Sequence, residues 1–213
     1  MTRIGVLGSG TVGQTLAKGL KAKGNEVRIG SRTPDKLAAF AKQEGVATGS
    51  FGDVGGWAEV LVLATKGTAA REALDLVGRA KLAGKVIMDV TNPIADEPPQ
   101  DGVLKFFTGP NSSLMETLQA AYPDARFVKA FNSIGHAQMV SPKLQGGPPT
   151  MFYCGNDEGA KALVAKIISQ FGWEGADMGT AAAARAIEPL CQLWCIPGFR
   201  QNSWTHAFKV LWK

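Results

Sequence analysis

The segment RIGVLGSGTVG, residues 3–13, decides the fold that we expect of this chain. A short apolar run ends at Gly8, and Gly8, Gly10 and Gly13 follow the spacing G-x-G-x-x-G. That spacing is weak alone, but it is specific where a buried strand precedes it and a helix follows it, as the pattern here indicates. In such a turn the first glycine permits the tight bend, the second lets the backbone approach a pyrophosphate, and the third lets the helix pack close to the strand.

The start of that helix is the predicted anion site. Free backbone N–H groups and the helix dipole at a helix N-terminus favour a phosphate. We therefore expect the residues of the turn to bind a dinucleotide: Gly8, Ser9, Gly10, Thr11, Val12 and Gly13. The alternative is a plain strand–helix turn that needs glycine only for its geometry.

Outward from this turn, the chain alternates short apolar runs with helical patterns, which is typical of parallel βαβ units. The expected strands are 2–7, 26–30, 60–64, 85–90, 126–131, 151–154 and 175–178. The expected helices are 12–23, 34–44, 68–80, 113–121 and 157–171, with a helical segment after 181 that is broken at Pro189 and Pro197. The predicted fold is α/β, a Rossmann-like doubly wound, mostly parallel sheet with a small C-terminal α/β extension. Residues 1–135 are the expected nucleotide-binding core, and residues 136–213 the extension packed on it.

The second strand ends in Ser31, Arg32 and Thr33, about twenty residues beyond the glycine turn. An NAD-binding chain usually carries Asp or Glu there to accept hydrogen bonds from the ribose 2′-hydroxyl. Two hydroxyls and a guanidinium instead present donors, and arginine forks onto phosphate oxygens. We therefore predict that these residues bind the 2′-phosphate of NADP(H); the alternative is that Arg32 is a solvated surface residue.

Composition excludes several other classes of protein. The 213 residues are 45% hydrophobic and 19% charged, as in a globular protein, and no apolar run is long enough to span a bilayer. The net charge of +5 comes from scattered residues with no basic run, so we expect no nucleic-acid partner and no membrane partner. The three cysteines form no metal-binding pattern, and we interpret Cys191 and Cys195 as reduced packing residues. No signal peptide is evident, and a cytoplasmic location is expected.

Six segments together resemble a known family. They are GSGTVGQTLAKGL, IGSRTPDKL, VIMDVTNPI, VKAFNSIG, FYCGND and DMGTAAAARAIEPL, and they span nearly the whole chain. In this order they resemble the NADP oxidoreductases of the coenzyme F420 (deazaflavin) dependent type. They also resemble the NADPH-binding domains of six-transmembrane metalloreductases.

The resemblance implies direct hydride transfer from NADPH to a flavin or deazaflavin ring, a small-molecule electron acceptor, with a homodimer as the expected assembly. Such transfer needs little acid–base machinery, because the cofactor carries the chemistry. It also implies that the nicotinamide lies near these residues, beyond the carboxyl ends of the later core strands: Ala64, Thr65, Lys66, Asn92, Pro93, Phe131 and Asn132. For Lys66 and Asn92 the alternative is a loop residue that satisfies its own backbone.

Two residues are candidates for a catalytic role, Asn132 and His136. A histidine occupies the place of Asn132 in the archaeal deazaflavin enzymes, whereas the metalloreductase domains share the "FN" seen here. His136 is suited to protonate or orient an acceptor, since its unperturbed pKa is about 6.5, or else it is structural.

The C-terminal residues leave further alternatives open. Arg185 either helps close the acceptor site or pairs with Glu188. The tail aromatics form a packing face, a dimer contact or a wall of the acceptor pocket; they are Trp194, Phe199, Trp204, Phe208 and Trp212.

Two other functions compete with the reductase. A β-hydroxyacid or pyrroline-carboxylate type dehydrogenase shares the glycine turn, but it needs a long helical domain that the last eighty or so residues do not predict. A non-catalytic NADP(H) sensor would carry the same cofactor site, because direct hydride transfer leaves no catalytic signature.

Overall fold

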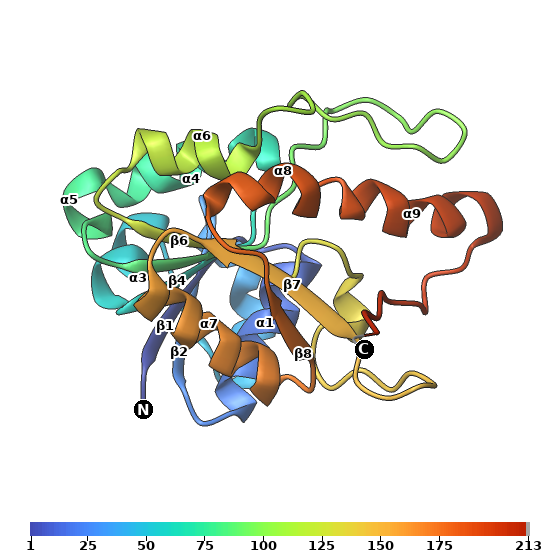
Figure 1. Cartoon of the computed structure of the whole chain (residues 1–213). Coiled ribbons are helices and arrows are strands. Elements are labelled where there is room, and N and C mark those ends of the chain that lie inside the picture. The colour runs from blue at the N-terminus through green and yellow to red at the C-terminus, as the bar shows by residue number, and fades with distance from the viewer. Residues whose placement is uncertain (212–213) are drawn as a thin grey trace.

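A computed structural model describes residues 1–211 of the chain and arranges them around one sheet (Figure 1). In the described residues the sheet has eight strands in the order β3-β2-β1-β4-β5-β6-β7-β8. All neighbouring strands run parallel except the antiparallel pair β6 and β7. The strands are β1 (Arg3–Leu7), β2 (Glu26–Gly30), β3 (Ala47–Gly49), β4 (Val60–Leu63), β5 (Val86–Asp89), β6 (Arg126–Lys129), β7 (Thr150–Gly155) and β8 (Glu174–Asp177). The predicted Rossmann-like α/β fold is confirmed.

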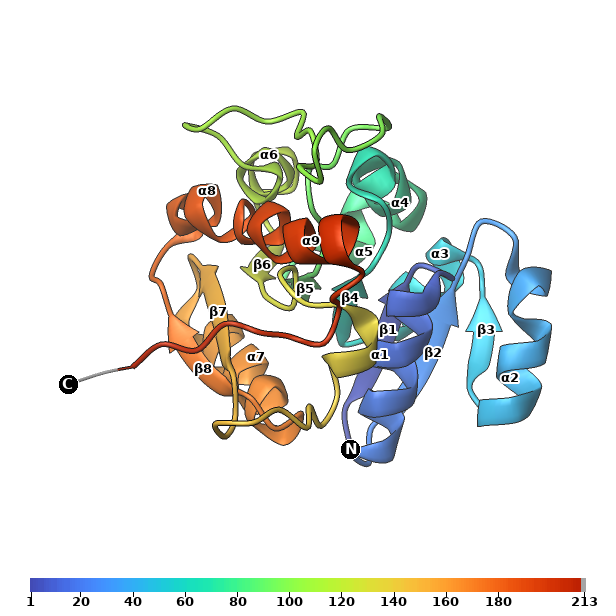
Figure 2. The same cartoon turned by 90° about the vertical axis from the view of Figure 1, so that its right-hand side faces the viewer.

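Helices cover both faces of this sheet. The α-helices are α1 (Thr11–Ala22), α2 (Ala38–Glu44), α3 (Phe51–Trp57), α4 (Ala70–Val77), α5 (Arg79–Leu82), α6 (Leu114–Ala121), α7 (Glu158–Gln170), α8 (Ala184–Ile187) and α9 (Leu190–Gln201). The short 3-10 helices are η1 (Pro34–Leu37), η2 (Gly67–Ala69), η3 (His136–Gln138) and η4 (Ala181–Ala183). Helices α1 and α7 pack on one face, and α3, α4, α6 and α8 pack on the other (Figures 1 and 2).

The central strands are apolar on both sides because both faces of the sheet are covered. In β4, Val62 faces the layer that holds α1, while Leu61 and Leu63 face the layer that holds α4. The same alternation in the neighbouring strands gives two cores, one on each side of the sheet. Because β1, β2, β4 and β5 run parallel, their carboxyl ends lie at one edge of the sheet, where the connecting loops leave it.

The last third of the chain continues this sheet. The predicted boundary between residues 135 and 136 lies in the connection from β6 to β7, at the start of η3. Strand β7 pairs with β6, β8 pairs with β7, and α7 packs against these strands. The tail after α9 runs back along β7, where the Thr150 amide donates to the carbonyl of Phe208 (2.9 Å).

The structure differs from the predicted elements at four places. Strand β3 and helix α3 were not expected, and α9 passes through Pro197 to Gln201 instead of breaking there. The segment after residue 201 has no helix among the described residues, although helical structure was expected.

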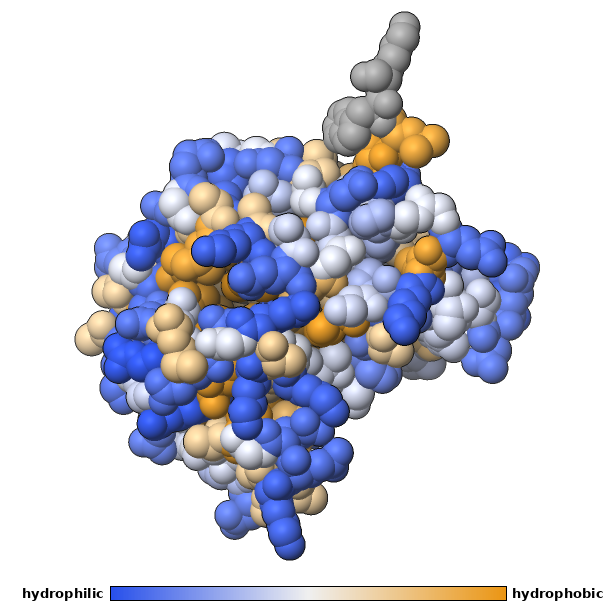
Figure 3. All heavy atoms as spheres, turned by 90° about the horizontal axis from the view of Figure 1, so that it is seen from below, coloured by the Kyte–Doolittle hydropathy of each residue, from blue (hydrophilic) through white to orange (hydrophobic). Residues whose placement is uncertain are grey.

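No helix in residues 1–211 has the length and apolarity that a bilayer span requires. From below, the visible surface is mostly hydrophilic with small, separate apolar spots (Figure 3).

Candidate functional site

The glycine turn has the close packing that its spacing predicts. Gly8 has a positive φ of 135°, and a Cβ there would overlap the backbone of Ala64 at the end of β4. A Cβ on Gly13 would overlap the carbonyl oxygen of Gly8. Gly10 is different, because a Cβ there would meet nothing within 4 Å. Two of these glycines are therefore required for packing, whereas Gly10 faces open space.

The N-terminus of α1 is prepared for an anion. Gly10 is the N-cap residue, no side chain caps the helix, and its first turn contains no acidic residue. The first N–H groups of a helix have no intrahelical partner, so here they are free to bind a ligand.

The second β–α corner is joined to the first by hydroxyl groups. The Ser31 hydroxyl donates to the Ser9 hydroxyl oxygen (3.3 Å) and accepts from the Thr33 amide (3.1 Å). Ser31 is buried, while Arg32 and Thr33 are exposed. Ser31 is thus a brace between the corners, and the Arg32 guanidinium is the group that reaches outward.

A cavity of about 1060 Å³ lies along the carboxyl ends of the strands and contains both corners. Twelve of the residues predicted to bind the cofactor line it: Gly8, Ser9, Gly10, Thr11, Val12, Ser31, Arg32, Thr33, Ala64, Thr65, Lys66 and Asn92. Five predicted residues do not line it: Gly13, Pro93, Phe131, Asn132 and His136. Several lining residues were missed by the sequence analysis: Lys36, Phe51, Gly67, Ala69, Glu72, Ala73, Val90, Thr91, Ile94, Ala95, Asp96 and Glu97. Of these residues, only Lys36 could have been found from the sequence, because it is a second cation four residues after Arg32.

The residues that line the cavity are suited to bind the phosphate groups of a dinucleotide. Gly10 offers open backbone at a helix N-terminus, and Arg32 and Lys36 supply positive charge beyond the second corner. The buried hydroxyl oxygen of Thr65 has no hydrogen-bond partner in the described structure. Because buried hydroxyls are normally paired, this atom is suited to a ligand group in the cavity.

Asn92 and Asn132 join two strand ends at the far end of the cavity. The Asn92 amide donates to the Asn132 carbonyl (2.7 Å), and the Asn132 amide donates to the Asn92 side-chain oxygen and to the Ile187 carbonyl (both 3.0 Å). Phe131, just before, has a positive φ of 57°, which is unusual for a bulky residue and turns the chain toward Asn92. The Phe131 ring is itself buried against Phe171 and Trp173. Asn132 therefore holds Asn92 from behind the cavity wall, and His136 is exposed at the start of η3.

A buried ionic network supports the same wall. The Lys129 ammonium lies 2.7 Å from Asp89 Oδ2 and 3.0 Å from Glu188 Oε1, and it donates to the Thr91 carbonyl (2.8 Å). Asp89 also accepts from the amide and hydroxyl of Thr91 (2.9 and 2.6 Å). Each of the three charged side chains is at most 1% exposed. Burial alone lowers the pKa of Lys129, but the charges and hydrogen bonds of Asp89 and Glu188 together raise it, so the ammonium stays charged.

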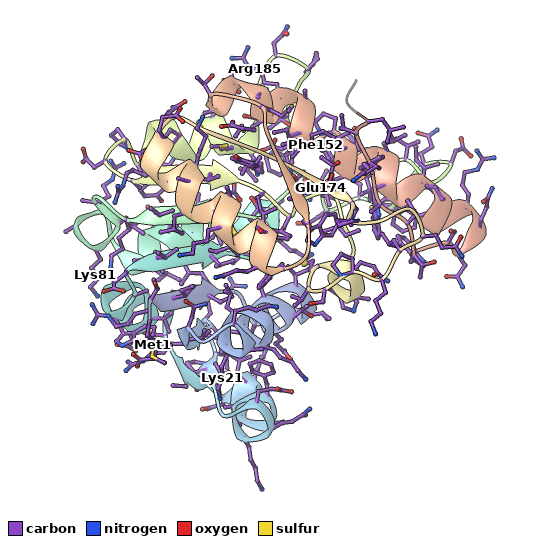
Figure 4. The ribbon with its side chains drawn as sticks, turned by 60° about the horizontal axis from the view of Figure 1, so that its bottom comes forward. Met1, Lys21, Lys81, Phe152, Glu174 and Arg185 are labelled. Atoms are coloured by element: carbon purple, nitrogen blue, oxygen red, sulfur yellow. The ribbon has the colours of Figure 1, made fainter. Side chains whose placement is uncertain are left out.

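Glu188 also caps α6. Its two carboxylate oxygens accept from the amides of Leu114 (2.9 Å) and Met115 (3.0 Å) in the first turn of that helix. Of the two alternatives for Arg185, the pair with Glu188 is therefore wrong. Arg185 lies on α8 at the rim of the molecule (Figure 4). Its guanidinium binds the Glu116 carboxylate (2.7 Å), and these hydrogen bonds lower the pKa of Glu116.

The tail aromatics contact one another. Trp194 stacks on His206 (centroids 5.1 Å apart) and packs beside Trp204, which also meets the Phe199 ring. None of the residues in this cluster lines the large cavity. Phe208 packs against the buried core, and Trp212 lies outside the described residues. Within residues 1–211, no three His, Cys, Asp or Glu residues are grouped to hold a metal ion.

Comparison with known proteins places this geometry in a family. The family model "NADP oxidoreductase coenzyme F420-dependent" matches residues 3–93. The structure superimposes on that of a candidate F420-dependent NADP-reductase from Arthrobacter sp. FB24 with a TM-score of 0.93 and 33% identity, covering 99% of this chain and 100% of that one. This chain belongs to the F420-dependent NADP oxidoreductase family.

Other relatives share parts of this family's structure. The rat metalloreductase STEAP3 is 31% identical over 199 residues, which are 92% of this chain and 38% of the relative. Human metalloreductase STEAP2 is 28% identical over 188 residues, and this chain covers 35% of it. The chain thus spans less than half the length of these curated relatives. A reductive aminase from Aspergillus terreus (18% identity, TM-score 0.66, 93% of this chain and 62% of that one) shows the fold alone.

The family is one of NADP-dependent oxidoreductases. The matched range, residues 3–93, contains the glycine turn, the Ser31–Thr33 corner, Lys66 and Asn92. Asn132, His136 and Lys129 lie beyond that range.

Proposed function

We propose that this oxidoreductase catalyses direct hydride transfer between NADP(H) and a flavin or deazaflavin acceptor of the coenzyme F420 type. The observation that carries the proposal is the single cavity that joins the glycine turn, the basic corner at Arg32 and the amide of Asn92. Ligands of open α/β sheets bind outside the carboxyl ends of the strands, which is where this cavity lies.

At the adenosine end, Arg32, Lys36 and Thr33 are suited to the 2′-phosphate. The Arg32 side chain is 62% exposed, so burial does not prevent it from turning onto a phosphate. Ser31 keeps the corner in place through its bonds to Ser9 and Thr33 rather than contributing a free donor. A charge-assisted hydrogen bond of this kind contributes about 1.5–3 kcal/mol.

At the nicotinamide end, the Thr65 hydroxyl and Asn92 are the groups that would orient the ring and its ribose. Asn132 is a positioning residue in this proposal, since it fixes the Asn92 side chain from outside the cavity. NADPH supplies the hydride when bound, and the acceptor takes it up. The protein's own part is to set distance and ring face, and it needs no general acid for that step.

The test is anaerobic oxidation of NADPH, followed by absorbance, with FMN, FAD, the deazaflavin and a ferric chelate offered in turn. Turnover with a flavin-type acceptor supports the proposal. Tight NADPH binding without turnover across the panel contradicts it and favours an NADP(H) sensor. The variant Asn92→Ala should lose turnover more than it loses binding, whereas Asn111→Ala, in the same loop but exposed, should change neither.

A further inference from the structure

The cation expected to bind the 2′-phosphate is already paired with a carboxylate. The Arg32 Nη1 lies 3.3 Å from Glu72 Oε1 and 3.2 Å from Glu72 Oε2. Arg32 follows β2 and Glu72 lies in the first turn of α4, so the pair crosses from one wall of the cavity to the other. The two side chains are 62% and 55% exposed, and neither is held in place by burial.

A similar pairing occurs at the next strand end. Lys66 binds Asp96 (3.0 Å) and both line the cavity. The charged residues that line the described cavity are three cations and three anions: Arg32, Lys36, Lys66, Glu72, Asp96 and Glu97. A formally neutral wall is unexpected for a ligand with several phosphate charges. The carboxylates therefore compete with the ligand for the same cations.

We propose that Glu72 limits the preference for NADP(H) over NAD(H) by competing with the adenosine 2′-phosphate for Arg32, an inference that rests on the proposed NADP(H) site. A phosphate dianion displaces a carboxylate from an exposed guanidinium because such ion pairs are weak. Displacement still costs the Arg32–Glu72 contact and leaves a carboxylate beside the new phosphate. NADH has no 2′-phosphate, so its binding does not require this exchange.

Glu72 thus weakens the binding of NADPH and has little effect on NADH. Arg32 provides the preference for the phosphate, and Glu72 reduces it. The two residues are 40 positions apart and meet only because α4 follows β4, the strand on the far side of β1 from β2.

The experiment is a titration of wild type and Glu72→Gln with NADPH and with NADH at low salt. We expect the NADPH dissociation constant to fall about two- to fivefold, the range that an exposed ion pair represents, and the NADH constant to stay unchanged. The NADPH gain should shrink at high salt, where exposed charges are screened. Glu97→Gln is the matched control, because it removes one charge from the same cavity but its carboxylate binds Lys105 (2.8 Å). It should not produce a gain specific to NADPH.

The same substitution in a variant that lacks Arg32 tests whether Glu72 acts through that residue. In Arg32→Gln, the substitution Glu72→Gln should produce a smaller NADPH gain, because there is no guanidinium left to release. An equal gain with and without Arg32, or an equal change for NADPH and NADH, would overturn the role of Glu72. In that case a wild-type preference for NADPH would leave the proposed function standing. Failure of the wild type to bind either nucleotide would overturn both.

Discussion

Replacing Lys129 by methionine removes one cation and leaves two buried carboxylates without it. Asp89 would keep its bonds from Thr91, and Glu188 would keep the two amides of α6. These hydrogen bonds do not neutralise the two carboxylate charges, and each carboxylate side chain is at most 1% exposed. Breaking a buried ion pair by removing one partner costs about 3–5 kcal/mol, mostly the penalty of the stranded charge.

Urea unfolding monitored by fluorescence measures this loss. With a slope of about 3 kcal/mol per M, suitable for a chain of this length, the midpoint should fall by about 1–1.7 M with the slope unchanged. Lys161→Met is a matched control, because Lys161 also pairs with two carboxylates, those of Glu158 and Asp177. Those partners are 85% and 37% exposed and remain hydrated when the cation is lost. The control should therefore lose less than about 2 kcal/mol.

The pH dependence gives an independent check. In Lys129→Met, the uncompensated negative charge of the buried cluster favours proton uptake by the folded variant over proton uptake by the unfolded chain. The deficit of the variant should then shrink as the pH falls from 7 towards 5. In the wild type the raised pKa of Lys129 adds stability that is full below the unfolded value of about 10.4 and is lost at still higher pH. The reasoning is refuted if both methionine variants lose equally or if the deficit is independent of pH.

Three further predictions concern the cavity and the thiols. Arg32→Ala should raise the Michaelis constant for NADPH about 10- to 100-fold and that for NADH far less, by steady-state kinetics; equal effects would show that Arg32 does not contact the 2′-phosphate. Gly10→Ala should fold normally and bind NADPH more weakly, whereas Gly13→Ala, whose Cβ overlaps the Gly8 carbonyl, should lower the melting temperature; the reverse order in calorimetry would contradict this geometry. Cys195, whose pKa is lowered by a hydrogen bond from Cys191, should be alkylated first at pH 8, because the pKa of Cys154 is raised to about 12 by burial and that of Cys191 is raised by its hydrogen bond to Cys195 and by burial; mass spectrometry of the labelled chain would detect a different first site.

Prediction from the sequence succeeded where one residue type has one physical use. The glycine spacing of β1 and α1 was predictable because only glycine tolerates those close approaches, and it led directly to the sheet. It failed at α3, where Gly52, Gly55 and Gly56 give a poor helix propensity. A capping box between Ser50 and Asp53 and close packing of Gly55 on Val77 hold that helix instead, and the second of these is a tertiary contact.

The site was predictable only along single segments. The corner at Arg32 and the turn at Gly8 each lie in one short stretch, and all of their predicted residues except Gly13 line the cavity. The role of Asn132 behind the wall depends on a backbone with positive φ at Phe131, which no propensity predicts. Glu72 was missed for another reason, since its partner Arg32 comes from a different loop.

Because Lys129 pairs with carboxylates from two distant parts of the chain, segments of this protein cannot be exchanged freely with those of its relatives. The Lys129 ammonium is neutralised by one carboxylate from the first half of the chain and one from the last thirty residues. A chimera that takes its C-terminal third from a homologue lacking an acid at position 188 would lack one of the two buried carboxylates that pair with Lys129. Exchanging the C-terminal third between members of the family therefore requires that Asp89, Lys129 and Glu188 be transferred together.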